Sequence, residues 1–139
     1  AVYAANGARQ AARLEALDAE LALRLRPVSD VPFMVFHDAY QYFERRYDLN
    51  EVGRVEVSPE RPPSARHLSR LRKRIKTSGA VCVFAEPQIE PRVLPTLTEG
   101  LNVRIGVLDP LGADLLPGPE LYFVLLGRLA DALATCLKP

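Results

Sequence analysis

The chain has 139 residues, of which 48% are hydrophobic and 25% charged, and its 18 basic and 17 acidic side chains give a formal net charge of +1. This length and composition predict one domain with a conventional hydrophobic core. The charge balance excludes a general attraction to nucleic acid or anionic lipid, and no apolar run reaches the roughly 20 residues that a membrane-spanning helix needs. Because no signal peptide is visible and the chain begins at Ala1, we interpret it as a processed or truncated product.

The amino-terminal part predicts one long amphipathic helix. Leucines recur at three-to-four spacing between residues 4 and 26, and Pro27 ends the helix. Residues 33–36 then predict a buried strand, residues 39–47 a short helix, and residues 52–57 a second strand whose valines alternate with less apolar residues.

The second half continues this alternation of strands and helices. After a proline-rich loop, Ser64 predicts the cap of a helix that ends at Ser78-Gly79. The remaining predicted elements are a strand at 81–85, a helix at 91–99, a strand at 103–108 and a helix at 120–137. This order predicts an α/β fold with a four-stranded parallel sheet flanked by helices.

Three of the predicted strands lead directly into side chains that bind metals. His37 and Asp38 follow the first strand, Glu86 follows the third, and Asp109 follows the fourth. The carboxyl ends of parallel strands share one edge of the sheet, which is where open α/β sheets bind their ligands. A histidine among carboxylates at that edge is a candidate metal site.

Cys82 and Cys136 are the only two cysteines. They are either two buried thiols that act as small hydrophobes, or a structural disulfide. Cys82 lies in a predicted strand and Cys136 in the last turn of the final helix, and no C-x-x-C spacing points to zinc or redox chemistry. This placement favours a disulfide and an oxidising compartment.

Four motifs in order resemble those of one known family. They are Val35–Tyr40, Val81–Gln88, Leu108–Gly112 and Thr135–Lys138. With them the chain resembles, over essentially its whole length, the periplasmic zinc-binding proteins of bacterial ABC transporters, the ZnuA type. Proteins of this family have two α/β lobes joined by one long helix, and they hold the metal between the lobes.

The resemblance implies a division of the chain. Residues 1–28 would be the interlobe linker helix and residues 29–139 the carboxyl-terminal lobe. The amino-terminal lobe, which supplies two further zinc-binding histidines in the family, would be missing. We therefore expect zinc binding by this chain to be weak or absent.

The resemblance also implies roles for single residues. His37 matches a zinc ligand of the family, and a histidine rather than a glutamate at this position favours zinc over manganese. Asp109 matches a carboxylate ligand of some relatives, and we give a loop-capping role equal weight. Cys82 and Cys136 match a disulfide of the zinc-type members.

Four further groups near these motifs need an interpretation. We expect Glu86 to accept the other ring N–H of a ligand histidine rather than to bind metal itself. Asp38 either supports the imidazole in the same way or caps the helix after it, and we favour the cap. We expect His67 to lie on the surface and the basic run at 70–76 to form the solvated face of a helix.

The sequence thus predicts zinc capture in the periplasm and delivery to an ABC importer, without enzymatic activity. The expected partners are the missing lobe, the permease of the inner membrane and a second copy of the chain, but no nucleic acid. A small metallohydrolase using His37, Asp109 and Glu86 is the alternative, although such a site needs three protein ligands, a water position and a general base. A third hypothesis is an interaction domain that binds no metal.

Overall fold

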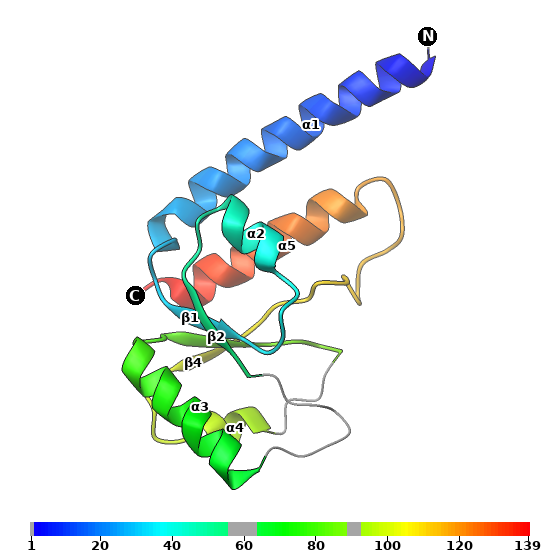
Figure 1. Ribbon diagram of the computed structural model, residues 1–139. Helices are drawn as coiled ribbons and strands as arrows, with labels where there is room; N and C mark the ends of the chain where they lie inside the picture. The colour runs from blue at the N-terminus through cyan, green and yellow to red at the C-terminus, as the bar shows by residue number, and fades with distance from the viewer. Residues whose placement is uncertain (1, 56–63, 89–92) are drawn as a thin grey trace.

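The computed structural model describes residues 2–55, 64–88 and 93–139, and its centre is a sheet of four parallel strands (Figure 1). The strands are β1 (Phe33–Val35), β2 (Glu51–Arg54), β3 (Cys82–Ala85) and β4 (Arg104–Val107), in the order β2-β1-β3-β4. The helices are α1 (Val2–Leu25), α2 (Gln41–Arg46), α3 (Ala65–Ser78), α4 (Val93–Thr98) and α5 (Leu121–Leu137). The predicted α/β class and the four-stranded parallel sheet are confirmed.

Helices cover both faces of the sheet because successive strand residues point to opposite sides. Phe33, Cys82 and Phe84 pack on the side of α1 and α5, whereas Met34 and Val83 pack on the side of α3 and α4. The central strands β1 and β3 are buried along their whole length. Figure 1 shows these two helical layers on either side of the sheet.

The long first helix is confirmed, and it ends one residue earlier than predicted. A 3-10 turn, Arg26–Val28, follows it and contains Pro27. Leu21 and Leu25, near the carboxyl end of α1, are fully buried, whereas residues 2–12 of the helix are all exposed. Figure 1 shows this first half of α1 extending away from the sheet.

The other helices and strands lie where the sequence predicts them, with shifts of one or two residues at the described ends. Residues 56 and 57 of the predicted second strand and residues 91 and 92 of the predicted helix lie outside the described residues. The edge strand β4 is more exposed than an apolar strand in a parallel sheet usually is, with Ile105 at 47% and Val107 at 55%.

The disulfide is present: Cys82 of β3 and Cys136 of α5 are bonded, with their Cα atoms 6.2 Å apart. Gly106 of β4 permits this close approach of α5 to the sheet, because a Cβ there would lie 2.5 Å from the Phe84 ring and 3.1 Å from Cys136 Sγ. The bond joins the end of the last helix to the centre of the sheet.

His67 is half-buried and does not lie free on the surface, so that expectation is wrong. Its Nε2 lies 3.2 Å from the carbonyl oxygen of Val55, which fixes the ring against the end of β2. The cap predicted just before it is confirmed, since the Ser64 hydroxyl accepts a hydrogen bond from the His67 backbone N–H.

The basic run of α3 is only partly a solvated face. The Arg72 guanidinium donates to the carbonyl oxygens of Thr96, Leu97 and Glu99 at the end of α4. Arg74 Nε donates to Val52 in β2. These arginines bond carbonyl groups that a helix end or an edge strand leaves without a partner, so they join α3 to its neighbours.

Glu44 of α2 is one of two buried carboxylates in the described residues, with a residue exposure of 9%. Burial, followed by the negative charges of Glu51 and Asp38, raises its pKa to about 7, against a smaller opposing effect of Arg54. No sequence pattern indicates this raised pKa, because the charged groups near Glu44 come from β2 and from the loop after β1.

We expect the loss of the disulfide to cost about 4 kcal/mol of unfolding free energy, because the bond closes a loop of 54 residues. Urea unfolding of the oxidised chain, compared with the same chain in a reductant, measures this difference. The Cys82→Ala/Cys136→Ala variant is the control and should not respond to the reductant. Free thiols in the oxidised sample would contradict the bond.

We expect Glu44 to make the stability depend on pH. Between pH 4.5 and about 7 the folded state holds a proton that the unfolded state has released, so the stability falls as the pH rises through this interval. The Glu44→Gln variant should therefore gain about 2 kcal/mol relative to the wild type on going from pH 5 to pH 8. Thermal unfolding at both pH values measures this, with the exposed Glu15→Gln as control, and an equal effect at both values would contradict it.

Candidate metal centre

The carboxyl ends of β1, β3 and β4 meet at one edge of the sheet, and the predicted residues follow them. Val35 of β1 pairs with Phe84 of β3, and Phe84 pairs with Gly106 of β4. His37 and Asp109 each lie two residues beyond their strand, and Glu86 follows β3 directly. The parallel order therefore gathers all three side chains at this edge.

His37 and Glu86 are in contact. His37 Nδ1 lies 2.5 Å from Glu86 Oε1, and the His37 side chain is 46% exposed whereas that of Glu86 is 2% exposed. This contact is favourable when Nδ1 carries the ring proton, since two lone pairs at this distance would repel each other. The alignment is imperfect, since Oε1 has no partner within hydrogen-bond geometry in the described part of the chain. With Nδ1 protonated, Nε2 is the ring nitrogen left to bind another group.

Tyr40 lies behind this pair and is almost fully buried. Its hydroxyl donates to the carbonyl oxygen of Leu108 over 3.3 Å, and its ring centroid lies 6.5 Å from that of His37. Burial raises the pKa of Tyr40 far above its usual range, and the nearby negative charge of Glu86 raises it further. The sequence alone does not indicate this bond, because Leu108 lies far along the chain from Tyr40.

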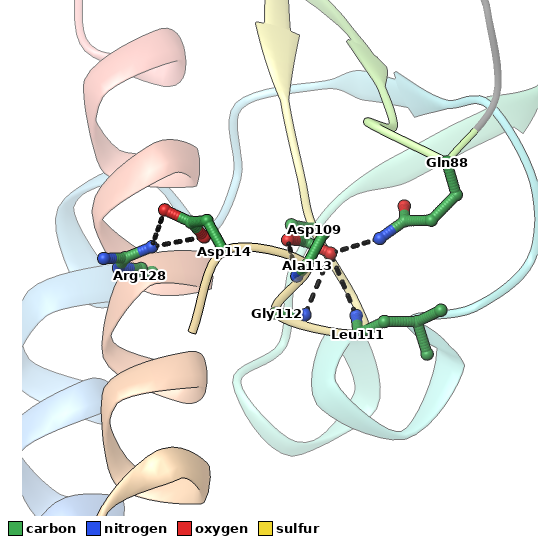
Figure 2. A network of polar contacts seen from close by, with 7 residues as sticks. All are labelled: Gln88, Asp109, Leu111, Gly112, Ala113, Asp114 and Arg128. Carbon is green, nitrogen blue, oxygen red and sulfur yellow. Dashed lines mark hydrogen bonds and ion pairs between the residues drawn. The ribbon is translucent and has the colours of Figure 1, made fainter. Parts of the chain in front are cut away.

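Asp109 organises the loop that follows β4 (Figure 2). Its Oδ1 accepts the backbone N–H groups of Leu111 and Gly112 and the side-chain amide of Gln88, the last over 2.5 Å. Its Oδ2 accepts the N–H of Ala113 over 2.6 Å. The loop-capping role is thus present, and Gln88, in the turn after β3, adds a hydrogen bond that the sequence did not indicate.

These bonds also set the charge of Asp109. Partial burial works against ionisation, but the hydrogen bonds from Gln88 and from the three backbone groups outweigh it and hold the pKa of Asp109 below its usual value. The carboxylate is therefore ionised at neutral pH.

A second contact holds the same loop against α5. Arg128 Nη1 donates to both carboxylate oxygens of Asp114, over 2.7 and 2.8 Å (Figure 2). Gly112, at the sharpest point of the loop, has a positive φ of 68°, which favours glycine. The segment after β4 is thus fixed at both ends.

Asp38 does not cap α2, so the favoured interpretation of this residue is wrong. The helix begins at Gln41, and its N-cap is Tyr40, which makes no side-chain cap bond. Asp38 Oδ2 instead pairs with Arg54 Nη1 over 2.7 Å, and Arg54 also lies 3.6 Å from Glu51. The loop that carries His37 is held to the end of β2 in this way.

The donor set at the edge is small. Residues 2–55, 64–88 and 93–139 contain no cluster of three or more histidine, cysteine, aspartate or glutamate side chains that suits a metal ion. The edge offers one imidazole and one ionised carboxylate, whereas a tetrahedral zinc site needs four donors, or three and a water. Such a donor set fits zinc in kind but is incomplete in number.

No helix in the described residues is both long enough and apolar enough to cross a bilayer.

Known proteins that are similar to this chain belong to one family. The family described as the periplasmic zinc-uptake complex component A matches residues 1–136. The High-affinity zinc uptake system protein ZnuA of Brucella suis is 48% identical over 138 residues, which are 99% of this chain and 41% of the relative. That of Yersinia pestis is 42% identical over 114 residues, 82% of this chain and 36% of the relative.

Solved structures agree. A crystal structure of ZnuA is similar with a TM-score of 0.78 at 31% identity, over 98% of this chain and 48% of that one. A zinc-bound ZnuA deletion mutant gives a TM-score of 0.76 at 31% identity, over 99% of this chain and 49% of that one. The chain thus spans about two fifths of its curated relatives and half of these structures. On this evidence the chain belongs to the ZnuA family of zinc-uptake components.

Proposed function

We propose that this chain is the carboxyl-terminal lobe and linker helix of a solute-binding protein that captures zinc in the periplasm and delivers it to an ABC importer. The observation that carries the proposal is the contact of half-exposed His37 with buried Glu86 at the edge of the sheet. The names of the relatives, which are high-affinity zinc uptake proteins, support zinc as the cargo. The family description supports the periplasm as the compartment.

In this proposal His37 binds zinc through Nε2. Glu86 accepts the proton on Nδ1, which selects the neutral tautomer with a free lone pair on Nε2 and makes the ring a stronger donor. Glu86 itself is too deeply buried to reach a metal at the surface, so its role is to orient the imidazole. Asp38 supports the same loop through Arg54.

Asp109 is the second proposed ligand. Three donors occupy its Oδ1, but among the described residues only the Ala113 N–H donates to Oδ2, so a lone pair of Oδ2 remains for a metal. Zinc would then bind Oδ2 while the hydrogen bonds that hold the loop stay in place. The loop bonds also orient the carboxylate before the metal arrives, which lowers the cost of ordering it.

The remaining donors belong to an amino-terminal lobe that this chain does not include. The small share of the relatives that the chain spans supports this division, with residues 1–28 as the linker and 29–139 as the lobe. Delivery to the permease follows when the lobes part and donors are lost. The metallohydrolase alternative gains no support, because the described residues do not gather the three ligands that it needs.

We expect this chain to bind zinc weakly, and we expect the binding to depend on His37. Most of the coordination free energy of a complete site comes from donors that the chain lacks. The affinity should fall at acidic pH, because a proton then competes with the metal for the ring nitrogen. Calorimetric titration of the wild type and of His37→Ala between pH 5.5 and 8 measures both effects.

The matched control for this titration is His67→Ala, which removes the other histidine. The His67 ring contacts the carbonyl oxygen of Val55, directly after β2. The variant should bind zinc as the wild type does. Tight binding by the wild-type chain, or equal binding by the wild type and His37→Ala, would show that the ligands lie elsewhere.

We also propose that the isolated lobe forms a homodimer. A groove of about 550 Å³ between α1, α2 and α5 is lined by apolar side chains, among them Leu14, Phe43 and Tyr122. Residues 2–12 of α1, which come before it along the helix, are all exposed. Exposed apolar surface of this kind favours self-association.

We expect sedimentation velocity to show a monomer–dimer equilibrium that depends on concentration. Leu14→Glu places a charge in the groove and should shift the equilibrium to the monomer. Leu23→Glu, at an exposed leucine of the same helix outside the groove, is the control. A monomer at all concentrations would contradict the dimer.

A further inference from the structure

The segment directly after β3 contacts both proposed ligands. Glu86 Oε1 lies 2.5 Å from Nδ1 of His37, and Gln88, two residues further on, donates its side-chain amide to Asp109 Oδ1 over 2.5 Å. β3 lies between β1 and β4 in the sheet, so side chains at its end can reach the ligand that follows either neighbour. Each proposed ligand is therefore paired with one side chain of this segment.

The two oxygens of Asp109 are used unequally. Figure 2 shows Gln88 reaching Oδ1 from the side of β3, while the backbone N–H groups of Leu111 and Gly112 reach it from the loop. A carboxylate oxygen has two lone-pair sites, so these three donors leave none of them for a metal. Among the described residues only the Ala113 N–H donates to Oδ2. The carboxylate can therefore bind a metal through one oxygen but not through both.

This restriction matters because cations differ in how they use a carboxylate. Zinc takes four ligands in a tetrahedron, and a single carboxylate oxygen fills one of these positions. Manganese and calcium prefer oxygen ligands and take six or more of them, and both oxygens of one carboxylate can fill two of these positions. A carboxylate that offers only one oxygen therefore suits zinc better than it suits these cations.

Gln88 is the donor that completes the restriction. Leu111 and Gly112 are neighbours in the chain and approach Oδ1 from the loop, so they can share one of its lone pairs. Gln88 then occupies the other, and its hydrogen bond is the shortest of the three. The side chain is exposed, so it is not needed to fill the core.

We propose that Gln88 is a specificity-determining residue of the zinc site, whose amide occupies Oδ1 of Asp109 and limits this carboxylate to a single metal–oxygen bond. This inference rests on the proposed function, in which Asp109 binds zinc. Loss of the amide opens Oδ1 to a cation that uses both oxygens. The gain then falls to manganese rather than to zinc.

The experiment compares zinc and manganese binding by the wild-type chain and by Gln88→Ala. Calorimetry measures the zinc affinity, and the loss of the free-ion electron paramagnetic resonance signal measures the manganese affinity. We expect the ratio of zinc affinity to manganese affinity to fall by about tenfold in the variant, the low end for the loss of a group that supports a ligand. A purely structural effect would lower both affinities together and leave the ratio unchanged.

Two further substitutions control for this effect. Gln10 is exposed in the first half of α1, which extends away from the sheet, and Gln10→Ala should keep the ratio of the wild type. Asp109→Asn keeps an oxygen that can accept the loop N–H groups but removes the carboxylate. In that background Gln88→Ala should change the ratio little, because Gln88 acts through the carboxylate.

The hydrogen bond itself can be tested without metal. The NMR signals of the Gln88 side-chain amide protons should shift in Asp109→Asn and should not shift in Gln10→Ala. Unmoved signals in Asp109→Asn, an unchanged ratio in Gln88→Ala, or an equal fall of the ratio in the Asp109→Asn background would overturn the inference. Equal zinc binding by the wild type and Asp109→Asn would also overturn it and leave His37 as a ligand, whereas the proposed function fails if His37→Ala binds zinc as the wild type does.

Discussion

The parallel pairing of β3 with β1 and β4 is the constraint on which the site depends. Since all strands run in one direction, their carboxyl ends lie at one edge, and side chains from three distant parts of the sequence meet there. The disulfide joins the same strand β3 to α5, so the last helix and the strand that carries Glu86 are linked covalently. A shift of β3 by one residue would exchange the faces of the sheet and also move Glu86 away from His37.

Each proposed ligand is supported differently, and both supports act before a metal arrives. His37 contacts a single buried carboxylate, whereas Asp109 is held by three backbone N–H groups and an amide. In both cases the protein has already ordered the side chain, so zinc binding would lose less free energy to ordering it. Within residues 2–55, 64–88 and 93–139 the edge nevertheless offers too few donors for a closed site, which agrees with the share of its relatives that the chain spans.

The buried carboxylates Glu44 and Glu86 differ in their surroundings. Burial, together with the negative charges of Glu51 and Asp38, raises the pKa of Glu44 to about 7. Glu86 instead contacts the imidazole of His37, with its Oε1 2.5 Å from Nδ1. Two glutamates of similar burial therefore lie in different electrostatic surroundings, because different strands and loops supply their neighbours.

The sequence by itself determined the class of fold, the order of its elements and the positions of His37, Glu86 and Asp109 at strand ends, because hydrophobic periodicity and helix caps are local properties. It favoured the disulfide from the positions of Cys82 and Cys136. Only the tertiary structure decided the partners of Asp38, His67, Tyr40 and Glu44, since each of them contacts or faces groups from other strands and loops. Hydrogen bonds and charges between distant segments leave no periodic pattern in a chain, and they exist only once the sheet has brought those segments together.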